Sequence, residues 1–331
     1  MTVTHERIGN DPQNFWVFDS ESDTFDLTRG SKSTSLITID TTTQRTRLDP
    51  AKTALLLIDL QNFFLHPAVR PRPEGAPPSP AEQATEALLR AGIPVARHHG
   101  IQIIWLCWGL TEDDLCQMPP AIIRTFGCYQ HGRSVVAHPS EQVGKLTPTP
   151  ILTPTPSLPD MHRVKDPALY KGLGTDLGPV TLSEKQTVPG GGVLMRGSWN
   201  ATLFDPFQQE YEISQSQQHG VTARTDSQTK ADVLFHKNRM SGLWGAGSEL
   251  ETFLQRENIT TLLFGGVNTD QCVGSTLTDA FSKGYDCILL RDGVGTGTPY
   301  GASTVWEYNS MNCWGFVTTC DALAGASVSP T

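Results

Sequence analysis

The feature that most constrains the fold is a set of short apolar runs separated by helix-like segments. The first run, Ala54-Leu55-Leu56-Leu57-Ile58, contains no polar residue, which is typical of a strand buried on both faces. A proline-rich loop over residues 67–80 and a stretch with helical spacing over residues 81–91 follow it. A second strand is predicted from Ile101 to Leu106. These segments form one predicted strand–helix–strand unit.

A second unit of this kind lies near the end of the sequence. Its predicted parts, in order, are a strand Thr261–Phe264, a turn Gly265-Gly266-Val267, a helix over residues 270–283 ended by Gly284, and a strand Asp286–Leu290. Residues 232–235 add a further strand between the two units. Because strands alternate with helices, we predict an α/β fold: a doubly wound, mostly parallel sheet with helices on both faces.

The remaining segments suggest how the chain is organised around this sheet. Residues 1–50 are polar and lack helical periodicity, so we interpret them as an N-terminal extension that wraps a single domain over residues 51–331. Residues 109–196 interrupt the strand–helix rhythm with the Thr-Pro-rich run 146–156 and with Gly190-Gly191-Gly192. We expect a long insertion there, which could be an active-site lid, an oligomer contact or a solvated loop.

Charge and hydropathy exclude several classes of protein. The formal net charge is -9 and the sequence pI about 5.4, with no basic run, which argues against a nucleic-acid surface. No stretch approaches 18 consecutive apolar residues, so we expect no membrane span. The N-terminus has no apolar signal-like region, and we therefore expect a soluble, cytoplasmic protein.

The cysteine pattern does not suggest a disulfide framework. The seven cysteines form no C-x-x-C pair and are an odd number, so most are expected to be buried thiols. They are residues 107, 116, 128, 272, 287, 313 and 320.

Three polar residues stand out because each falls at the carboxyl end of a predicted strand, where reactive groups collect in open α/β sheets. Asp59 follows the first strand directly, Lys237 follows the strand that ends at Phe235, and Cys272 opens the helix after the strand that ends at Phe264. A helix N-terminus and a nearby ammonium both stabilise a thiolate. A carboxylate can accept the thiol proton and return it to a leaving amine.

Each of these residues alone has an ordinary structural explanation. A single cysteine on a helix is more often a packed small apolar residue, an aspartate after a strand often caps the next helix, and a lysine is usually solvated. The combination of the three is more specific, because the sequences around them resemble the isochorismatase-like cysteine hydrolase superfamily. The resemblance rests on three stretches: Leu57-Ile58-Asp59-Leu60-Gln61-Asn62, His236-Lys237-Asn238-Arg239-Met240-Ser241-Gly242, and Gly266-Val267-Asn268-Thr269-Asp270-Gln271-Cys272-Val273 with Thr276 and Asp279-Ala280.

The resemblance covers about residues 51–62, 93–108 and 196–321, and it implies a role for each polar residue. Cys272 would be the nucleophile, Asp59 the general base and acid, and Lys237 the cation that stabilises the thiolate. It also implies a cis peptide between Val267 and Asn268, with the backbone N–H groups of Asn268 and Cys272 forming the oxyanion hole.

Within the superfamily, the sequence is most similar to ureidoacrylate amidohydrolases and N-carbamoylsarcosine amidases, through Arg196-Gly197-Ser198-Trp199-Asn200 and the H-K-x-R-x-S-G word. Met240 replaces the aromatic residue that is usual after the arginine, so the acyl pocket is expected to differ in shape. Branches that hydrolyse isochorismate can lack the cysteine, and Cys272 therefore favours C–N cleavage. The expected substrate pocket comprises Gln61, Phe63, Trp108, Trp199, Met240 and Val267.

Other motifs do not support a cofactor or a metal. Gly293, Gly295 and Gly297 have the wrong spacing for a dinucleotide loop and lack its acidic partner, so we interpret them as a loop. His98-His99 has no third ligand at a metal-site spacing. His66, seven residues after Asp59, lacks the partners found in metal-binding nicotinamidase-like relatives. We predict no catalytic metal and no cofactor.

The leading hypothesis is a hydrolase that cleaves a C–N bond of a small amide, ureido or carbamoyl substrate. One alternative is cleavage of an ester, hydroxamate or vinyl ether on the same scaffold, and another is a catalytically silent binding protein. The expected partners are a small-molecule substrate and further copies of the chain, as a homo-oligomer, either a dimer or a tetramer, with no nucleic acid and no membrane.

Overall fold

The computed structural model describes residues 5–127, 129–130, 133–134, 165–219, 230–299 and 301–328. Internal contacts divide the chain into two units, one comprising Met1–Trp108 with Leu203–Thr331, and the other Gly109–Thr202. In the described part of the chain, no helix has the length and apolar character needed to cross a membrane.

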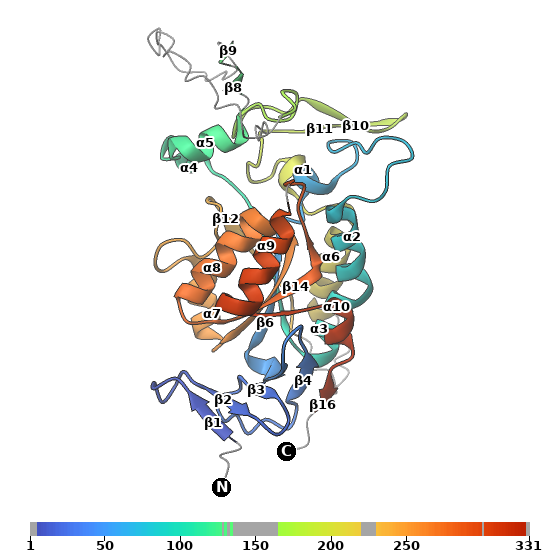
Figure 1. The fold of residues 1–331 in the computed structure, drawn as a ribbon. Helices are drawn as coiled ribbons and strands as arrows, with labels where there is room; N and C mark the ends of the chain where they lie inside the picture. Colours follow the sequence, from blue (N-terminus) through green and yellow to red (C-terminus); the bar gives the residue numbers. More distant parts are fainter. Residues whose placement is uncertain are drawn as a thin grey trace, which may run out of the picture. The chain divides into compact units, whose positions relative to one another are not determined.

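The first unit is built around a six-stranded parallel sheet (Figure 1). In spatial order its strands are β12 (Val233–Lys237), β7 (Gln102–Trp108), β6 (Thr53–Ile58), β13 (Thr261–Val267), β14 (Asp286–Gly295) and β15 (Gly315–Thr318). Every residue of β6, β7 and β13 is buried, which is why these segments do not alternate polar and apolar residues. The predicted doubly wound α/β fold is confirmed.

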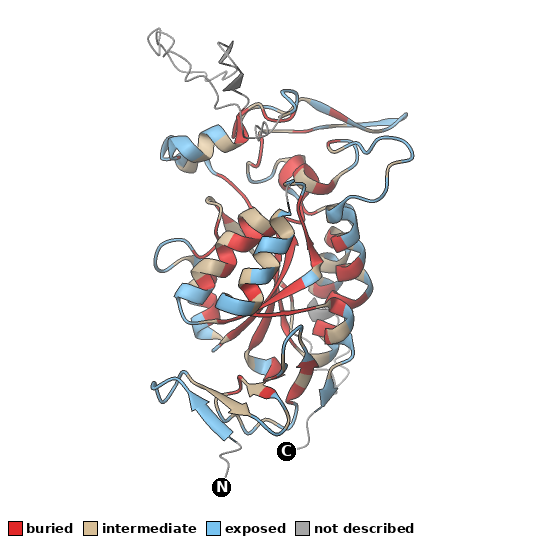
Figure 2. Cartoon of the chain, viewed as in Figure 1, coloured by how far each residue is buried: buried red, intermediate tan, exposed pale blue. Residues whose placement is uncertain are grey.

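Helices cover both faces of this sheet (Figure 1). On one face lie α7 (Glu249–Arg256), α8 (Gly274–Ser282) and α9 (Ala302–Asn309); on the other lie α2 (Pro80–Ala87), α3 (Ile93–His99), α6 (Asp205–His219) and α10 (Cys320–Ala324). Shorter helical elements are η1 (Pro50–Lys52), α1 (Asn62–Leu65), η2 (Leu88–Gly92), η4 (Thr269–Val273) and η5 (Ser310–Trp314). Figure 2 shows that buried residues line the sheet and the helix sides that face it.

Two glycine-rich segments that the sequence predicts to be a turn and a loop are strand instead. Gly265-Gly266-Val267 continues β13, and Gly293 and Gly295 lie within β14. The reason is close packing. Gly266 has a φ of 115°, and a Cβ there would lie 2.1 Å from the Ile58 carbonyl oxygen, while a Cβ at Gly295 would lie 2.4 Å from the carbonyl oxygen of Pro80. The glycines let neighbouring backbones approach and do not end the strands.

The helix predicted over residues 81–91 is longer in the structure. Helical conformation continues through α2, η2 and α3 to His99, starting from a capping box in which Ser79 and Glu82 bond each other's backbone N–H. Pro94 lacks the N–H for an ordinary helical bond, and the wider π turn of η2 precedes it. Gly100, with a φ of 72°, ends the helix.

The N-terminal extension forms its own sheet at the amino end of the core strands (Figure 1). In spatial order this sheet contains β1 (His5–Ile8), β2 (Trp16–Asp19), β3 (Thr24–Asp26), β5 (Arg45–Leu48), β4 (Ile37–Asp40) and β16 (Ser327–Val328). Both ends of the described chain therefore contribute to one sheet. Only β3 and β5 pair in parallel.

The second unit, Gly109–Thr202, contains the whole of the predicted insertion over residues 109–196. Its elements are α4 (Glu112–Cys116), α5 (Pro120–Phe126), β8 (Tyr129–Gln130), β9 (Arg133–Ser134), β10 (Pro179–Ser183), β11 (Gln186–Pro189) and η3 (Trp199–Ala201). Its two ends lie side by side, because Leu110 bonds the backbone of Leu194 and Arg196. The Thr-Pro run over residues 146–156 lies outside the described residues, so its role as lid or oligomer contact stays a prediction.

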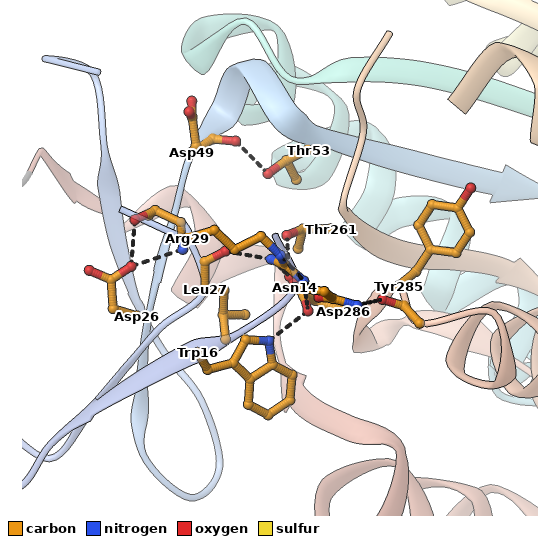
Figure 3. Close-up of polar contacts among 12 residues, drawn as sticks. Asn14, Trp16, Asp26, Leu27, Arg29, Asp49, Thr53, Thr261, Tyr285 and Asp286 are labelled. Carbon is orange, nitrogen blue, oxygen red and sulfur yellow. Dashed lines mark hydrogen bonds and ion pairs between the residues drawn. The ribbon is translucent and has the colours of Figure 1, made fainter. Parts of the chain in front are cut away.

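A buried ion pair fastens the N-terminal extension to the core (Figure 3). The guanidinium of Arg29 donates to both carboxylate oxygens of Asp286, the first residue of β14, at 2.6 and 2.8 Å. Trp16 Nε1 and Thr261 Oγ1 donate to the same carboxylate at 2.7 and 3.0 Å. The side chains of Arg29 and Asp286 are 7% and 2% exposed, so each charge depends on the other.

We expect Arg29→Ala to lower the free energy of unfolding by about 3–5 kcal/mol, because it leaves the buried Asp286 carboxylate without its cation. Urea unfolding would measure this loss. Arg90→Ala is the matched control, since the pair of Arg90 with Asp321 is 53% and 60% exposed and should matter far less. Equal losses in the two variants would contradict the anchoring role.

Candidate active site

The three candidate catalytic residues come from different elements that meet at the carboxyl edge of the parallel sheet. Asp59 directly follows β6, Lys237 is the last residue of β12, and Cys272 lies in η4, the turn that leads from β13 into α8. Between β6 and β12 runs β7, whose last residue is Trp108. Lys237 and Trp108 are register partners, which places their side chains at one level of the sheet.

Asp59 and Lys237 form an ion pair in the interior. Lys237 Nζ lies 3.1 Å from Asp59 Oδ2, and the two side chains are 1% and 0% exposed. Nζ also donates to the carbonyl oxygen of Arg239 at 3.3 Å. Apart from the ion pair, neither carboxylate oxygen of Asp59 meets a donor of standard hydrogen-bond geometry in the part of the chain that the structure describes. Oxygen lone pairs of Asp59 are therefore available to accept a proton.

The protonation of Asp59 is set mainly by burial. Removal from water raises the pKa of its carboxyl above the usual value of 3.8, while the charge of Lys237 and the approach of the Cys272 thiol oppose the rise. A raised pKa makes this carboxylate a better proton acceptor than an exposed aspartate. The backbone of Asp59, with a φ of 55°, is in the left-handed region, which aspartate tolerates better than most residues.

Cys272 is buried, and its sulfur touches two further side chains. Trp108 Nε1 donates to Sγ at 3.4 Å, and Met240 Sδ lies 3.3 Å from Sγ. Burial raises the pKa of the Cys272 thiol to about 12, and the negative charge of Asp59 adds to the rise. Lys237 and Trp108 oppose it. The sequence suggests a thiolate supported by Lys237 and a helix N-terminus, but burial outweighs these effects in the resting site, where the thiol is protonated.

Trp108 is held by two hydrogen bonds and contacts both Lys237 and Cys272. The side-chain amide of Gln61 bonds the Trp108 backbone twice, accepting from its N–H at 2.9 Å and donating to its carbonyl oxygen at 2.8 Å. Lys237 Nζ lies 4.0 Å from the centroid of the indole ring. The face of the Trp108 indole thus stabilises the Lys237 ammonium, and the N–H of the same ring donates to Cys272 Sγ.

Thr276 joins η4, the turn that contains Cys272, to the loop after β12. Its hydroxyl donates to the Cys272 carbonyl oxygen at 2.7 Å and accepts from the backbone N–H of Gly242 at 3.2 Å. The sequence contains one signal of this role, because Thr276 lies four residues after Cys272 on the same helical face. The role itself depends on Gly242, which only the fold brings close.

The residues expected in the substrate pocket lie in different surroundings. Met240 contacts Cys272, and Trp108 donates to it, whereas Gln61 is buried and uses its amide on the Trp108 backbone. Val267 belongs to the apolar core cluster.

The remaining two expected pocket residues are Phe63 and Trp199. Phe63 is fully buried, with its ring 5.1 Å from the Arg70 guanidinium, and Trp199 belongs to the second unit. In the described part of the chain, Met240 and Trp108 contact Cys272, and the wider pocket stays a prediction.

The turn before Cys272 contains Asn268, whose predicted role in an oxyanion hole stays a prediction. The Val267–Asn268 peptide is cis, at the position that the family resemblance implies. The carbonyl oxygen of Asn268 accepts from the N–H groups of Gln271 and Val273. Asp270 bonds the hydroxyl of Thr296 at 2.6 Å, an attachment of this turn to the end of β14 that sequence reasoning missed.

Among the residues that the structure describes, no three His, Cys, Asp or Glu side chains gather in a way that could hold a metal ion. His98 and His99 end α3 with their rings 4.9 Å apart. The candidate residues described at this edge of the sheet are Asp59, Lys237, Cys272 and Trp108.

Comparison with known proteins finds a family match in the C-terminal part of the chain. Residues 185–322 match the family model described as the isochorismatase domain. The matched segment contains Lys237 and Cys272 and begins after Asp59.

Curated relatives extend the similarity. The chain is 28% identical over 140 residues to the ureidoacrylate amidohydrolase RutB of Serratia proteamaculans (strain 568), covering 42% of this chain and 48% of that protein. It is 35% identical over 92 residues to the RutB of Stutzerimonas stutzeri (strain A1501), covering 28% and 36%. To the RutB of Methylobacterium radiotolerans it is 24% identical over 287 residues, covering 86% and 83%.

The chain thus spans about half or less of the first two relatives and most of the third. A cysteine hydrolase structure from Pseudomonas syringae pv. phaseolicola 1448A aligns with a TM-score of 0.49 and 13% identity, covering 84% of this chain and 93% of that one. The predicted resemblance to the isochorismatase-like superfamily, near ureidoacrylate amidohydrolases, is confirmed by the family match and the curated relatives.

We expect Lys237→Met to move the alkylation of Cys272 by iodoacetamide to higher pH. The Lys237 charge lowers the pKa of Cys272 and of Asp59, so its removal raises both and makes the thiol proton harder to lose. Mass spectrometry of each cysteine would follow the reaction, with the exposed Cys313 as reference in the same sample. Lys237→Arg keeps the charge and should shift the profile less. An unchanged profile in the Met variant would remove Lys237 from the site.

Trp108→Phe should shift the same profile in the same direction but by less. The variant keeps a ring beneath Lys237 and removes one neutral donor to Sγ, worth about 1 kcal/mol, or up to about tenfold in rate. Trp105→Phe is a matched control in the same strand, because Trp105 Nε1 donates to Asp232 and not to the site. If both variants behave like the wild type, the indole N–H does not support the sulfur.

Proposed function

We propose that this protein is a cysteine hydrolase that cleaves a C–N bond of a small amide, ureido or carbamoyl substrate through a thioester intermediate. The observation that carries the proposal is the buried Asp59–Lys237 ion pair beside the Cys272 thiol, with the Trp108 N–H directed at the sulfur. The similarity to ureidoacrylate amidohydrolases supports the C–N bond as the target.

Activation of the nucleophile conserves charge inside the site. At rest the site holds an aspartate anion, a lysine cation and a neutral thiol. When the Cys272 proton moves to Asp59, the site holds a neutral carboxyl, the same cation and a thiolate, so no net charge is created in the interior. Burial raises the pKa of both the carboxyl and the thiol. It therefore opposes loss of the thiol proton to water, but it opposes transfer of that proton to Asp59 much less.

The thiolate then attacks the carbonyl carbon of the substrate. A bond forms between Sγ and that carbon, and the carbonyl electrons move to its oxygen, which the backbone N–H groups of Asn268 and Cys272 would stabilise. Asp59 gives its proton to the leaving nitrogen, the C–N bond breaks, and an amine or ammonia departs. In the second half, Asp59 takes a proton from water, the hydroxide displaces Sγ, and Asp59 returns that proton to the thiolate.

Lys237 serves both halves as the constant positive charge. It faces an anion that is alternately the Asp59 carboxylate and the Cys272 thiolate. Because its Nζ is fixed between Asp59 Oδ2, the Arg239 carbonyl oxygen and the Trp108 ring, it need not move as the charge shifts. Action in the cytoplasm and assembly into a homo-oligomer remain predictions.

We expect Cys272→Ser to fold normally and to lose nearly all turnover, because a hydroxyl is far less acidic than a thiol and the same base cannot activate it. A panel of amides, ureides and esters, scored for ammonia or amine release, would provide the assay. Wild-type protein should also accumulate an acyl adduct on Cys272 when quenched during turnover. Undiminished turnover in the serine variant would overturn the mechanism, and ester cleavage without amide cleavage would overturn the substrate class.

A further inference from the structure

Met240 occupies the space that a substrate must enter. Its Sδ lies 3.3 Å from Cys272 Sγ. A carbonyl carbon about to be attacked must lie about 3–3.5 Å from the nucleophile, in the same shell around Sγ. The thioether and the acyl group therefore compete for one position, unless the acyl group approaches from another side of the sulfur.

The other neighbours of Sγ leave little room for such a second approach. Asp59, Lys237 and Trp108 are buried, whereas Met240 is half-buried. Asp59 and Lys237 are bound to each other, and Trp108 is held by both hydrogen bonds of the Gln61 amide. Met240 is the most exposed of these four residues, which points to the side of the sulfur that it covers as the side nearest to solvent.

The backbone around Met240 is pinned, so that movement falls to its side chain. On one side, Lys237 Nζ donates to the carbonyl oxygen of Arg239. On the other, the N–H of Gly242 donates to Thr276, and a Cβ at Gly242 would lie 2.4 Å from Leu106 Cδ2. A methionine side chain has three rotatable bonds and no branch, and it can swing aside where the backbone cannot.

From this geometry we propose that Met240 is the gate of the acyl site and the residue that limits the size of the acyl group. The thioether covers Sγ at rest and rotates away when substrate arrives. A carbamoyl group, with one carbon and two small substituents, needs only a slight rotation, whereas a bulky acyl group needs the whole space of the side chain. The preference for small carbamoyl substrates rests on the proposed function. The gate itself concerns only how reagents reach the sulfur, and it can be tested without that function.

Thiol reagents of graded size test the gate without any knowledge of the substrate. Cys272 would be alkylated with iodoacetamide and with bulky N-phenyl iodoacetamide in wild type, Met240→Ala and Met240→Leu. Each rate would be divided by that of Cys313, which is exposed and reports the intrinsic reactivity of each reagent. The buried Cys107, Cys287 and Cys320 report folding, because they should stay unlabelled in every variant.

For Cys272, we take the ratio of the alkylation rate with the bulky reagent to the rate with iodoacetamide. We expect Met240→Ala to raise this ratio by about tenfold or more, a usual scale for steric selection in a pocket. Met240→Leu, of similar volume, should keep the wild-type ratio. The midpoint of the pH profile for alkylation by iodoacetamide should be the same in Met240→Ala as in the wild type. An unchanged midpoint would show that the substitution alters access to Cys272 and not the acidity of its thiol.

The proposal would be overturned if Met240→Ala reacted faster with both reagents by the same factor, or with neither. It would also be overturned if a shift in the midpoint of the pH profile accounted for the whole change in rate. If the wild-type protein released no amine from any amide, the proposed function would fail while the alkylation ratios still decided the gate. If amides were cleaved but the ratios did not change, the gate alone would fail.

Discussion

The structure depends most on one interaction, the ion pair between Asp59 and Lys237. Two charges without contact with water are costly to hold, and each is tolerated because the other lies 3.1 Å away. The pair also fixes the order of the strands around it. Asp59 follows β6 and Lys237 ends β12, with β7 between them, so Trp108 at the end of β7 lies beneath the ammonium. A different lateral order would leave one charge buried alone.

In the proposed mechanism, this arrangement would let a thiol whose pKa burial raises to about 12 act as a nucleophile. One proton would move from Cys272 to Asp59, while Lys237 balances whichever of the two groups is negative. The Trp108 N–H favours the thiolate further. Burial thus keeps the thiol inert towards water at rest and leaves its activation to an internal partner. Met240, in contact with the sulfur, would add the proposed control of access to this chemical one.

A second buried ion pair serves stability at the other end of the same sheet. Asp286 begins β14 and binds Arg29 of the N-terminal extension, with Trp16 and Thr261 completing its hydrogen bonds. This carboxylate is fully satisfied, whereas Asp59 has lone pairs left to accept a proton. Both residues are aspartates, so the contrast between them follows from the groups that surround each carboxylate. A carboxylate with four donors is held as an anchor, and one with a single cation can exchange a proton.

The sequence by itself determined the parallel α/β fold and the placing of Asp59, Lys237 and Cys272 at strand ends, because apolar runs and their spacing are local properties of the chain. It misjudged Gly265–Val267 and Gly293–Gly295, whose glycines permit close packing and do not end strands. Tertiary structure alone decided that Trp108 joins ammonium to thiol, that Thr276 holds Gly242, and that Met240 covers the sulfur. These contacts join residues more than 30 positions apart, and burial, which sets the pKa of the thiol, exists only once the layers have packed.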